Sequence, residues 1–135
     1  MLKLIVGVKG TGKTKELISL VNKATEETNG AVVCIEKGTK LMHEISYKTR
    51  LIDTEAYDVT SAASLYGLAA GTYASNHDVT HIFIDSALKI CNNDLATFGE
   101  LVKCAAAFAE KNGIDVVMTS SIPAEDLPEE IKKYL

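Results

Sequence analysis

The sequence predicts an α/β fold, a three-layer α/β/α sandwich in which helices cover both faces of a mainly parallel sheet. Three observations carry this prediction. The chain has 135 residues, 47% of them hydrophobic and 24% charged, which suits one globular domain over 1–135. Short apolar runs alternate along the chain with helical patterns, as parallel strands with crossover helices do. One of these runs, 31–36, is almost continuously apolar, which is typical of a strand buried on both faces.

The first part of the chain supplies two strands and a helix. Residues 2–7 form an apolar strand that ends in glycine. A helix is expected over 13–28, because apolar residues recur there at helical spacing and Asn29-Gly30 ends the pattern. The run 31–36 is the second strand. The stretch 37–57 alternates only weakly, so we expect a loop with an edge strand or a hairpin there.

The rest of the chain continues the alternation. Strands are expected over 80–85 and 114–120, and helices over about 61–75, over 92–113 and from Pro128 onward. Asn93 or Asp94 can cap the start of the 92–113 helix. Gly67 and Gly71, four residues apart in the 61–75 helix, predict close packing of that helix on the sheet.

Composition narrows the classes of partner. The formal net charge is −4, and Arg50 is the only arginine among 14 basic residues, which argues against a nucleic-acid binder. No apolar run is long enough to span a membrane and the start does not resemble a signal peptide, so we expect a cytoplasmic protein. Cys34, Cys91 and Cys104 lack metal-ligand spacing, and we expect Cys34 and Cys104 to be buried. A homo-oligomer or a protein partner is left open.

The segment "GVKGTGKT", residues 7–14, carries the clearest chemistry. It has the phosphate-loop spacing, two glycines separated by four residues and then Lys-Thr, between a strand and a helix. Glycines let backbone N–H groups turn inward toward phosphate oxygens, and the start of the helix adds its partial positive charge. Lys13 is expected to reach the terminal phosphates and Thr14 to bind Mg²⁺. The predicted nucleotide-binding residues are Gly7, Val8, Lys9, Gly10, Thr11, Gly12, Lys13, Thr14 and Lys15.

On these residues the chain resembles the P-loop NTPases over most of its length. The strand "HIFID" looks like the Walker-B strand of that family, which implies that Asp85 at its end approaches Mg²⁺. No N-K-x-D guanine reader follows the appropriate strand, so ATP is expected rather than GTP. Ser86 stands where many ATPases place a glutamate that activates water. This position alone therefore does not supply a catalytic base.

The chain is similar on this point to the RecA-like ATPases, whose Walker-B strand also ends in Asp-Ser. In that division the base glutamate ends the neighbouring strand, which implies that Glu36 is catalytic together with Lys13. The resemblance also implies that Thr119, near the end of the fourth strand, contacts the nucleotide as a sensor of the γ-phosphate. It further implies a core order of first, fourth, third and second strand (1-4-3-2).

Two further resemblances are weaker guides to the function. The order of elements looks like thymidine kinase, but the paired cysteines of that family are missing. The chain is also similar to short bacterial ATP-binding proteins sometimes labelled twitching-motility ATPases, although it is too short for a secretion motor. The expected function is a small Mg·ATP-binding ATPase that hydrolyses the β–γ bond. The alternatives are a nucleotide-dependent switch module with negligible hydrolysis, or a small-molecule kinase whose lid only 37–57 could supply.

Some residues have no assigned role in the sequence. Tyr47, Tyr57, Tyr66 and Tyr73 could include one that stacks on adenine, and no pattern selects among them. Arg50 could act as an arginine finger on a neighbouring molecule, but a surface or ion-pairing role is the simpler expectation.

Overall fold

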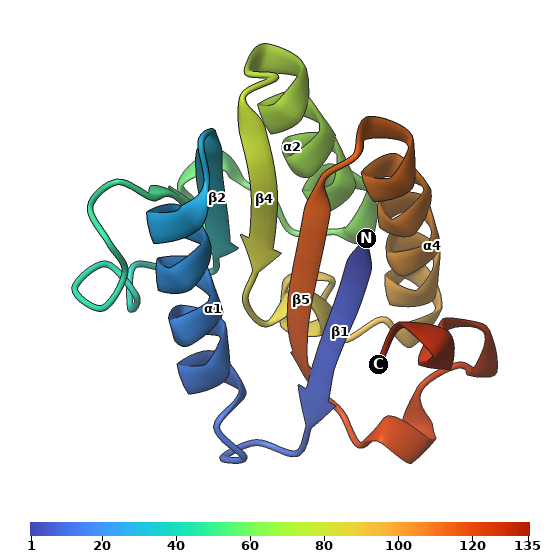
Figure 1. The fold of residues 1–135 in the computed structure, drawn as a ribbon. Helices are drawn as coiled ribbons and strands as arrows, with labels where there is room; N and C mark the ends of the chain where they lie inside the picture. Colours follow the sequence, from blue (N-terminus) through green and yellow to red (C-terminus); the bar gives the residue numbers. More distant parts are fainter.

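The structure, a computed structural model that describes all residues from Met1 to Leu135, is built on a five-stranded parallel sheet (Figure 1). The strands are β1 (Leu2–Gly7), β2 (Ala31–Glu36), β3 (Arg50–Asp53), β4 (Val79–Ile84) and β5 (Asp115–Ser121). Every pair of neighbouring strands is parallel. The predicted α/β class with a parallel sheet is confirmed.

The order of the strands is β1-β5-β4-β2-β3. It differs from the predicted four-strand order because the sheet contains a further strand, β3, outside β2. Residues 37–49 carry the chain back along the sheet, so β3 is a parallel edge strand and the alternative of a hairpin is wrong. The side chain of Asp53 fixes the end of β3, since its Oδ1 accepts hydrogen bonds from the amides of Gly38 (2.8 Å) and Glu55 (2.9 Å).

Helices lie on both faces of the sheet. They are α1 (Lys13–Glu27), α2 (Ala62–Ser75), the single turn α3 (Ala87–Ile90) and α4 (Leu95–Asn112). In Figure 1, α1 lies on one side of the sheet and α2 and α4 lie on the other. Alternate strand residues serve the two sides: Val32 and Cys34 of β2 pack with α1, whereas Val33 and Ile35 pack with α2 and α4.

Local chemistry explains where the helices begin and end. Asp94 caps α4 by accepting a hydrogen bond from the amide of Thr97 (3.3 Å), and Gly113 ends the helix in the left-handed region at φ 65°. Ser61 and Ser64 cap α2 reciprocally, each side chain accepting from the other residue's amide. The helix predicted from Pro128 is a 3-10 helix, Glu129–Tyr134.

Two predictions about packing are wrong. Gly67 and Gly71 are exposed, and a Cβ atom added at either would meet nothing within 4 Å, so α2 does not use them to approach the sheet. Cys104 is exposed, although Cys34 is buried as expected.

No helix in the structure combines the length and the apolar composition needed to cross a lipid bilayer.

The parallel arrangement brings all five carboxyl strand ends to one edge of the sheet. The carboxyl ends of β1, β5, β4 and β2 point toward the lower edge in Figure 1. The segments that follow these strands therefore gather there, and in open parallel sheets this edge is where ligands bind.

Candidate functional site

The phosphate-loop segment between β1 and α1 is closed by its own side chains. The Thr11 hydroxyl donates to the carbonyl oxygen of Val8 at 2.8 Å. A Cβ atom at Gly7 would lie 2.8 Å from that same hydroxyl, so only glycine permits this contact. Gly12 has φ 86°, a left-handed conformation that turns the chain into α1. The glycines at these two positions therefore shape the loop.

Lys13 folds back across the loop. Its Nζ donates to the carbonyl oxygen of Val8 at 2.9 Å and lies 3.5 Å from the Thr11 hydroxyl. It is the first residue of α1, whose initial amides have no partner within the helix. Neither bond of Lys13 involves a carboxylate, so its positive charge is not neutralised within the protein. The ammonium group is thus available to an anion in the loop.

Asp85 lies at the centre of a hydrogen-bonded group that joins three elements. The Thr14 hydroxyl, in the first turn of α1, donates to Asp85 Oδ1 at 3.3 Å. The Thr119 hydroxyl, in β5, donates to the same oxygen at 2.7 Å and accepts from the amide of Ser86 at 2.8 Å. Thr119 is buried and its single proton is committed to Asp85. In this geometry Thr119 positions the carboxylate.

Glu36 is the last residue of β2, the strand beside β4, and Asp85 comes directly after β4. The amide of Asp85 donates to the carbonyl oxygen of Ile35 at 2.9 Å, which places the two carboxylate residues side by side on neighbouring strands. The Glu36 side chain is only 3% exposed, and its Oε2 accepts from the amide of Leu41 at 3.0 Å. It forms no ion pair. Glu36 is therefore not a solvent-exposed strand end, and it is not paired with Lys37 or Lys40.

The pKa of Glu36 is raised above its ordinary value. Burial is the main cause, because it removes water from the ionised form, and the nearby charges of Asp85 and Asp53 add to it. Hydrogen bonds from the amides of Leu41 and Lys40 oppose the shift. A carboxyl group whose pKa lies closer to neutrality is a better proton acceptor in catalysis.

This shift predicts that Glu36→Gln stabilises the protein at high pH. Ionising Glu36 costs more in the folded state than in the unfolded chain, and this cost is fully present above the raised folded pKa and absent below the unfolded value. Glutamine keeps an acceptor for the Leu41 amide without the charge. At about pH 8 we expect the free energy of unfolding of the variant to exceed that of the wild type by about 1 kcal/mol.

Thermal unfolding of both proteins over a pH series measures this difference. The gain should shrink as the pH falls through the folded pKa and vanish below about pH 4.5, the ordinary value for the group. A stability difference that does not vary with pH would contradict a raised pKa at Glu36.

These residues line one cleft of about 570 Å³ at the carboxyl edge of the sheet. Of the predicted site residues, it is lined by Lys9, Gly10, Gly12, Lys13, Thr14, Lys15, Glu36, Asp85 and Thr119. Gly7, Val8 and Thr11 do not line the cleft. They support it from behind, through the contacts that close the loop.

Sequence reasoning missed part of the lining. The additional residues are Lys37, Lys40, Leu41, Ser86, Leu88, Lys89, Asn93 and Ser121. Lys37 could have been found, because it directly follows a strand end. Ser86 and Ser121 also lie at or just after strand ends. Lys40, Leu41, Leu88, Lys89 and Asn93 depend on how the loop after β2 and the segment around α3 fold over the edge, and no local pattern in the sequence specifies that.

The oxygen ligands at Asp85 fit Mg²⁺. No three His, Cys, Asp or Glu side chains cluster closely enough to hold a metal ion by themselves. The pair of Thr14 hydroxyl and Asp85 carboxylate offers hard oxygen donors of the kind Mg²⁺ prefers, and this ion usually completes its shell with substrate phosphates and water. The donor set therefore suits a metal that arrives with a phosphorylated ligand.

The residues left without a role lie outside the cleft. None of the tyrosines lines it, so the cleft wall offers no tyrosine ring for stacking. Arg50 is exposed at the start of β3, makes no ion pair and does not line the cleft.

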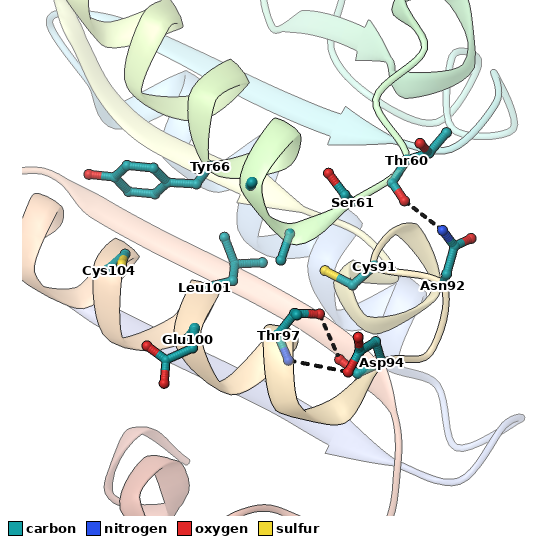
Figure 2. A pocket seen from close by; sticks show the side chains of 12 residues that line it. Thr60, Ser61, Tyr66, Cys91, Asn92, Asp94, Thr97, Glu100, Leu101 and Cys104 are labelled. Carbon is teal, nitrogen blue, oxygen red and sulfur yellow. Dashed lines mark hydrogen bonds between the residues drawn. The ribbon is translucent and has the colours of Figure 1, made fainter.

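A second cavity, of about 540 Å³, lies between α2 and α4 (Figure 2). Its lining includes Tyr66, Leu101, Cys91 and Cys104, and none of the predicted site residues. The hydrogen bond from Asn92 Nδ2 to the carbonyl oxygen of Thr60 (2.7 Å) crosses one end of it, as Figure 2 shows.

The three thiols should differ in reactivity. Burial raises the pKa of Cys34 to about 12 and that of Cys91 to about 11, and nearby carboxylates contribute to both shifts. Since the thiolate is the reactive form, we expect one rapidly labelled thiol per native molecule at about pH 8, that of exposed Cys104. Labelling with a disulfide reagent, followed by peptide mapping, measures this. Cys104→Ser should remove the fast phase, and fast labelling of Cys34 would contradict its burial.

No protein-family model matches this sequence, and no curated protein matches it.

Proposed function

We propose that this protein binds Mg·ATP in the cleft and hydrolyses its β–γ bond. The observation that carries the proposal is the 3.3 Å contact between Thr14 and Asp85, which are 71 residues apart in the chain. It joins the residue after the phosphate-loop lysine to the carboxylate that the P-loop resemblance implies as the metal partner. This proximity supports reading the two motifs as one site.

The protein groups would divide the work as follows. The loop amides, Lys13 and the start of α1 bind the β- and γ-phosphates. Thr14 and Asp85 hold Mg²⁺, which when bound neutralises charge on the phosphates. Thr119 keeps Asp85 in place through its 2.7 Å hydrogen bond. Glu36 orients a water molecule for attack in line with the leaving ADP and accepts its proton.

Glu36 is the reason to prefer hydrolysis over the alternatives. Its carboxyl group lines the same cleft as Asp85 and has a raised pKa. A switch module that only binds ATP would not need such a group. A small-molecule kinase is the second alternative, and it is favoured by the loop after β2, whose residues Lys37, Lys40 and Leu41 line the cleft. We place the protein in the cytoplasm, where Mg·ATP is supplied.

Asp85→Asn tests the proposed metal site. The amide keeps the shape of the side chain but loses the charge that attracts a divalent cation. We expect affinity for ATP in the presence of Mg²⁺ to fall about tenfold or more, by analogy with the loss of residues that orient a bound metal. With EDTA present, ATP should bind the variant at least as well as the wild type.

Calorimetric titration with ATP, and with GTP as the comparison nucleotide, provides the measurement. Asp58→Asn is a matched control, because Asp58 is exposed and does not line the cleft. Unchanged Mg·ATP affinity in Asp85→Asn would reduce Asp85 to a turn residue. If GTP binds as tightly as ATP or more tightly, the expected preference for ATP is wrong.

A further inference from the structure

Lysines are concentrated in the cleft beyond what a phosphate loop requires. Six of its 17 lining residues are lysines, whereas the whole chain has 13. The only acidic residues in the lining are Glu36 and Asp85. None of the six lysines forms an ion pair, although the chain has 18 acidic residues. A net acidic protein thus carries a local, uncompensated positive site.

The six lysines belong to two groups that follow different strands along the carboxyl edge of the sheet. Lys9, Lys13 and Lys15 stand in or next to the loop after β1. Lys37 and Lys40 follow β2, which is three strand positions from β1, or about 14 Å at the usual spacing of strands. Lys89 lies in α3, after β4. Phosphates held in the loop would therefore be bound by the first group, whereas the second group follows other strands of the sheet.

Lys37, Lys40 and Lys89, which we call the distal lysines, line the same cleft as Glu36 and Asp85. Lys37 and Lys40 follow β2, which ends at Glu36, and Lys89 follows the neighbouring strand β4, after which Asp85 comes directly. The charges converge on a cavity and do not form a stripe along an open face. This arrangement suits a compact anion better than the backbone of a nucleic acid, which needs a track of positive charge.

We propose that the distal lysines bind a second ligand beside the nucleotide, a small molecule with phosphate or carboxylate groups. The inference rests on the proposed function, since it takes the loop and Lys13 to be occupied by ATP. Lysine is a common phosphate ligand that acts as a point charge, and a carboxylate offers the same charge. The ligand would lie next to Glu36, where a co-substrate or an effector meets the γ-phosphate.

The experiment loads the protein with Mg²⁺ and a non-hydrolysable ATP analogue and then titrates it with inorganic phosphate, or in a parallel arm with citrate. We expect saturable binding of at least one of them to the loaded protein. In the triple variant Lys37→Gln/Lys40→Gln/Lys89→Gln that binding should weaken about tenfold or more. The comparison of the two arms distinguishes a phosphate-bearing ligand from a carboxylate-bearing one.

The control is Lys3→Gln/Lys23→Gln/Lys48→Gln, which removes three exposed lysines that neither line the cleft nor form ion pairs. If the analogue itself does not bind wild type, the proposed function fails and the inference falls with it. If the analogue binds but neither anion does, or if both triple variants weaken anion binding equally, the inference alone is overturned. Tighter binding of a short oligothymidylate that depends on the distal lysines would also overturn it, in favour of nucleic acid.

Discussion

Lys13→Ala should weaken ATP binding roughly 10- to 100-fold, the loss expected when a charge-assisted hydrogen bond to phosphate is removed. In the structure its ammonium group reaches over the loop to the carbonyl oxygen of Val8 at 2.9 Å and has no carboxylate partner. Lys13 could therefore pair with a bound phosphate without first breaking an ion pair within the protein. Isothermal titration with Mg·ATP measures the loss.

The fold should survive this change, because the side chain is only half-buried and packs in neither apolar cluster. Lys23→Ala is the matched control, since Lys23 is an exposed lysine on the same helix that does not line the cleft. If Lys13→Ala binds ATP as tightly as Lys23→Ala does, the loop is not the phosphate site and the proposed function is wrong.

Glu36→Gln should retain ATP affinity and lose turnover by about 100-fold or more, within the range that general-base catalysis contributes. The amide still accepts the 3.0 Å hydrogen bond from Leu41, so the loop after β2 should keep its position. It cannot take a proton from water, which is what the reaction requires. Phosphate release under saturating Mg·ATP, with binding measured separately, tests this expectation.

Glu44→Gln serves as the control, because Glu44 is an exposed carboxylate in the same loop region and does not line the cleft. Wild-type turnover in Glu36→Gln would show that another group orients the water. If the wild-type protein binds ATP without releasing phosphate, the switch-module alternative takes the place of the ATPase.

Much of this site could be predicted because each key residue ends a recognisable strand. The parallel sheet brings all strand ends to one edge, so Asp85 and Glu36 become neighbours once their strands are adjacent. Thr119 lies near the end of β5, and its role as a sensor is what the RecA-like resemblance implies. In the structure the Thr119 hydroxyl is bonded to Asp85 and is not free in the cleft. The sequence could not predict this contact, because it depends on side-chain rotamers.

Residues that follow the strands at a distance could not be placed from the sequence. Lys40 and Leu41 line the cleft because the loop after β2 folds inward, which no periodicity encodes. Lys89 lies in α3, a single turn too short to give a helical pattern. The edge strand β3 was only one of two expectations for its region. Its four residues follow a long loop, so its partner is decided by tertiary packing.

The hydrogen bond between Glu36 and Leu41 ties the motion of a surface segment to the chemistry of the cleft. The Leu41 side chain is buried beside α1 while its amide is held by the Glu36 carboxyl group. The amide proton of Leu41 can exchange with solvent only when the loop after β2 opens locally or the hydrogen bond to the Glu36 carboxyl group breaks. The hydrogen-exchange rate of the Leu41 amide therefore reports how often its hydrogen bond to Glu36 breaks. Hydrogen exchange follows such opening over minutes to hours, a timescale that turnover assays do not sample.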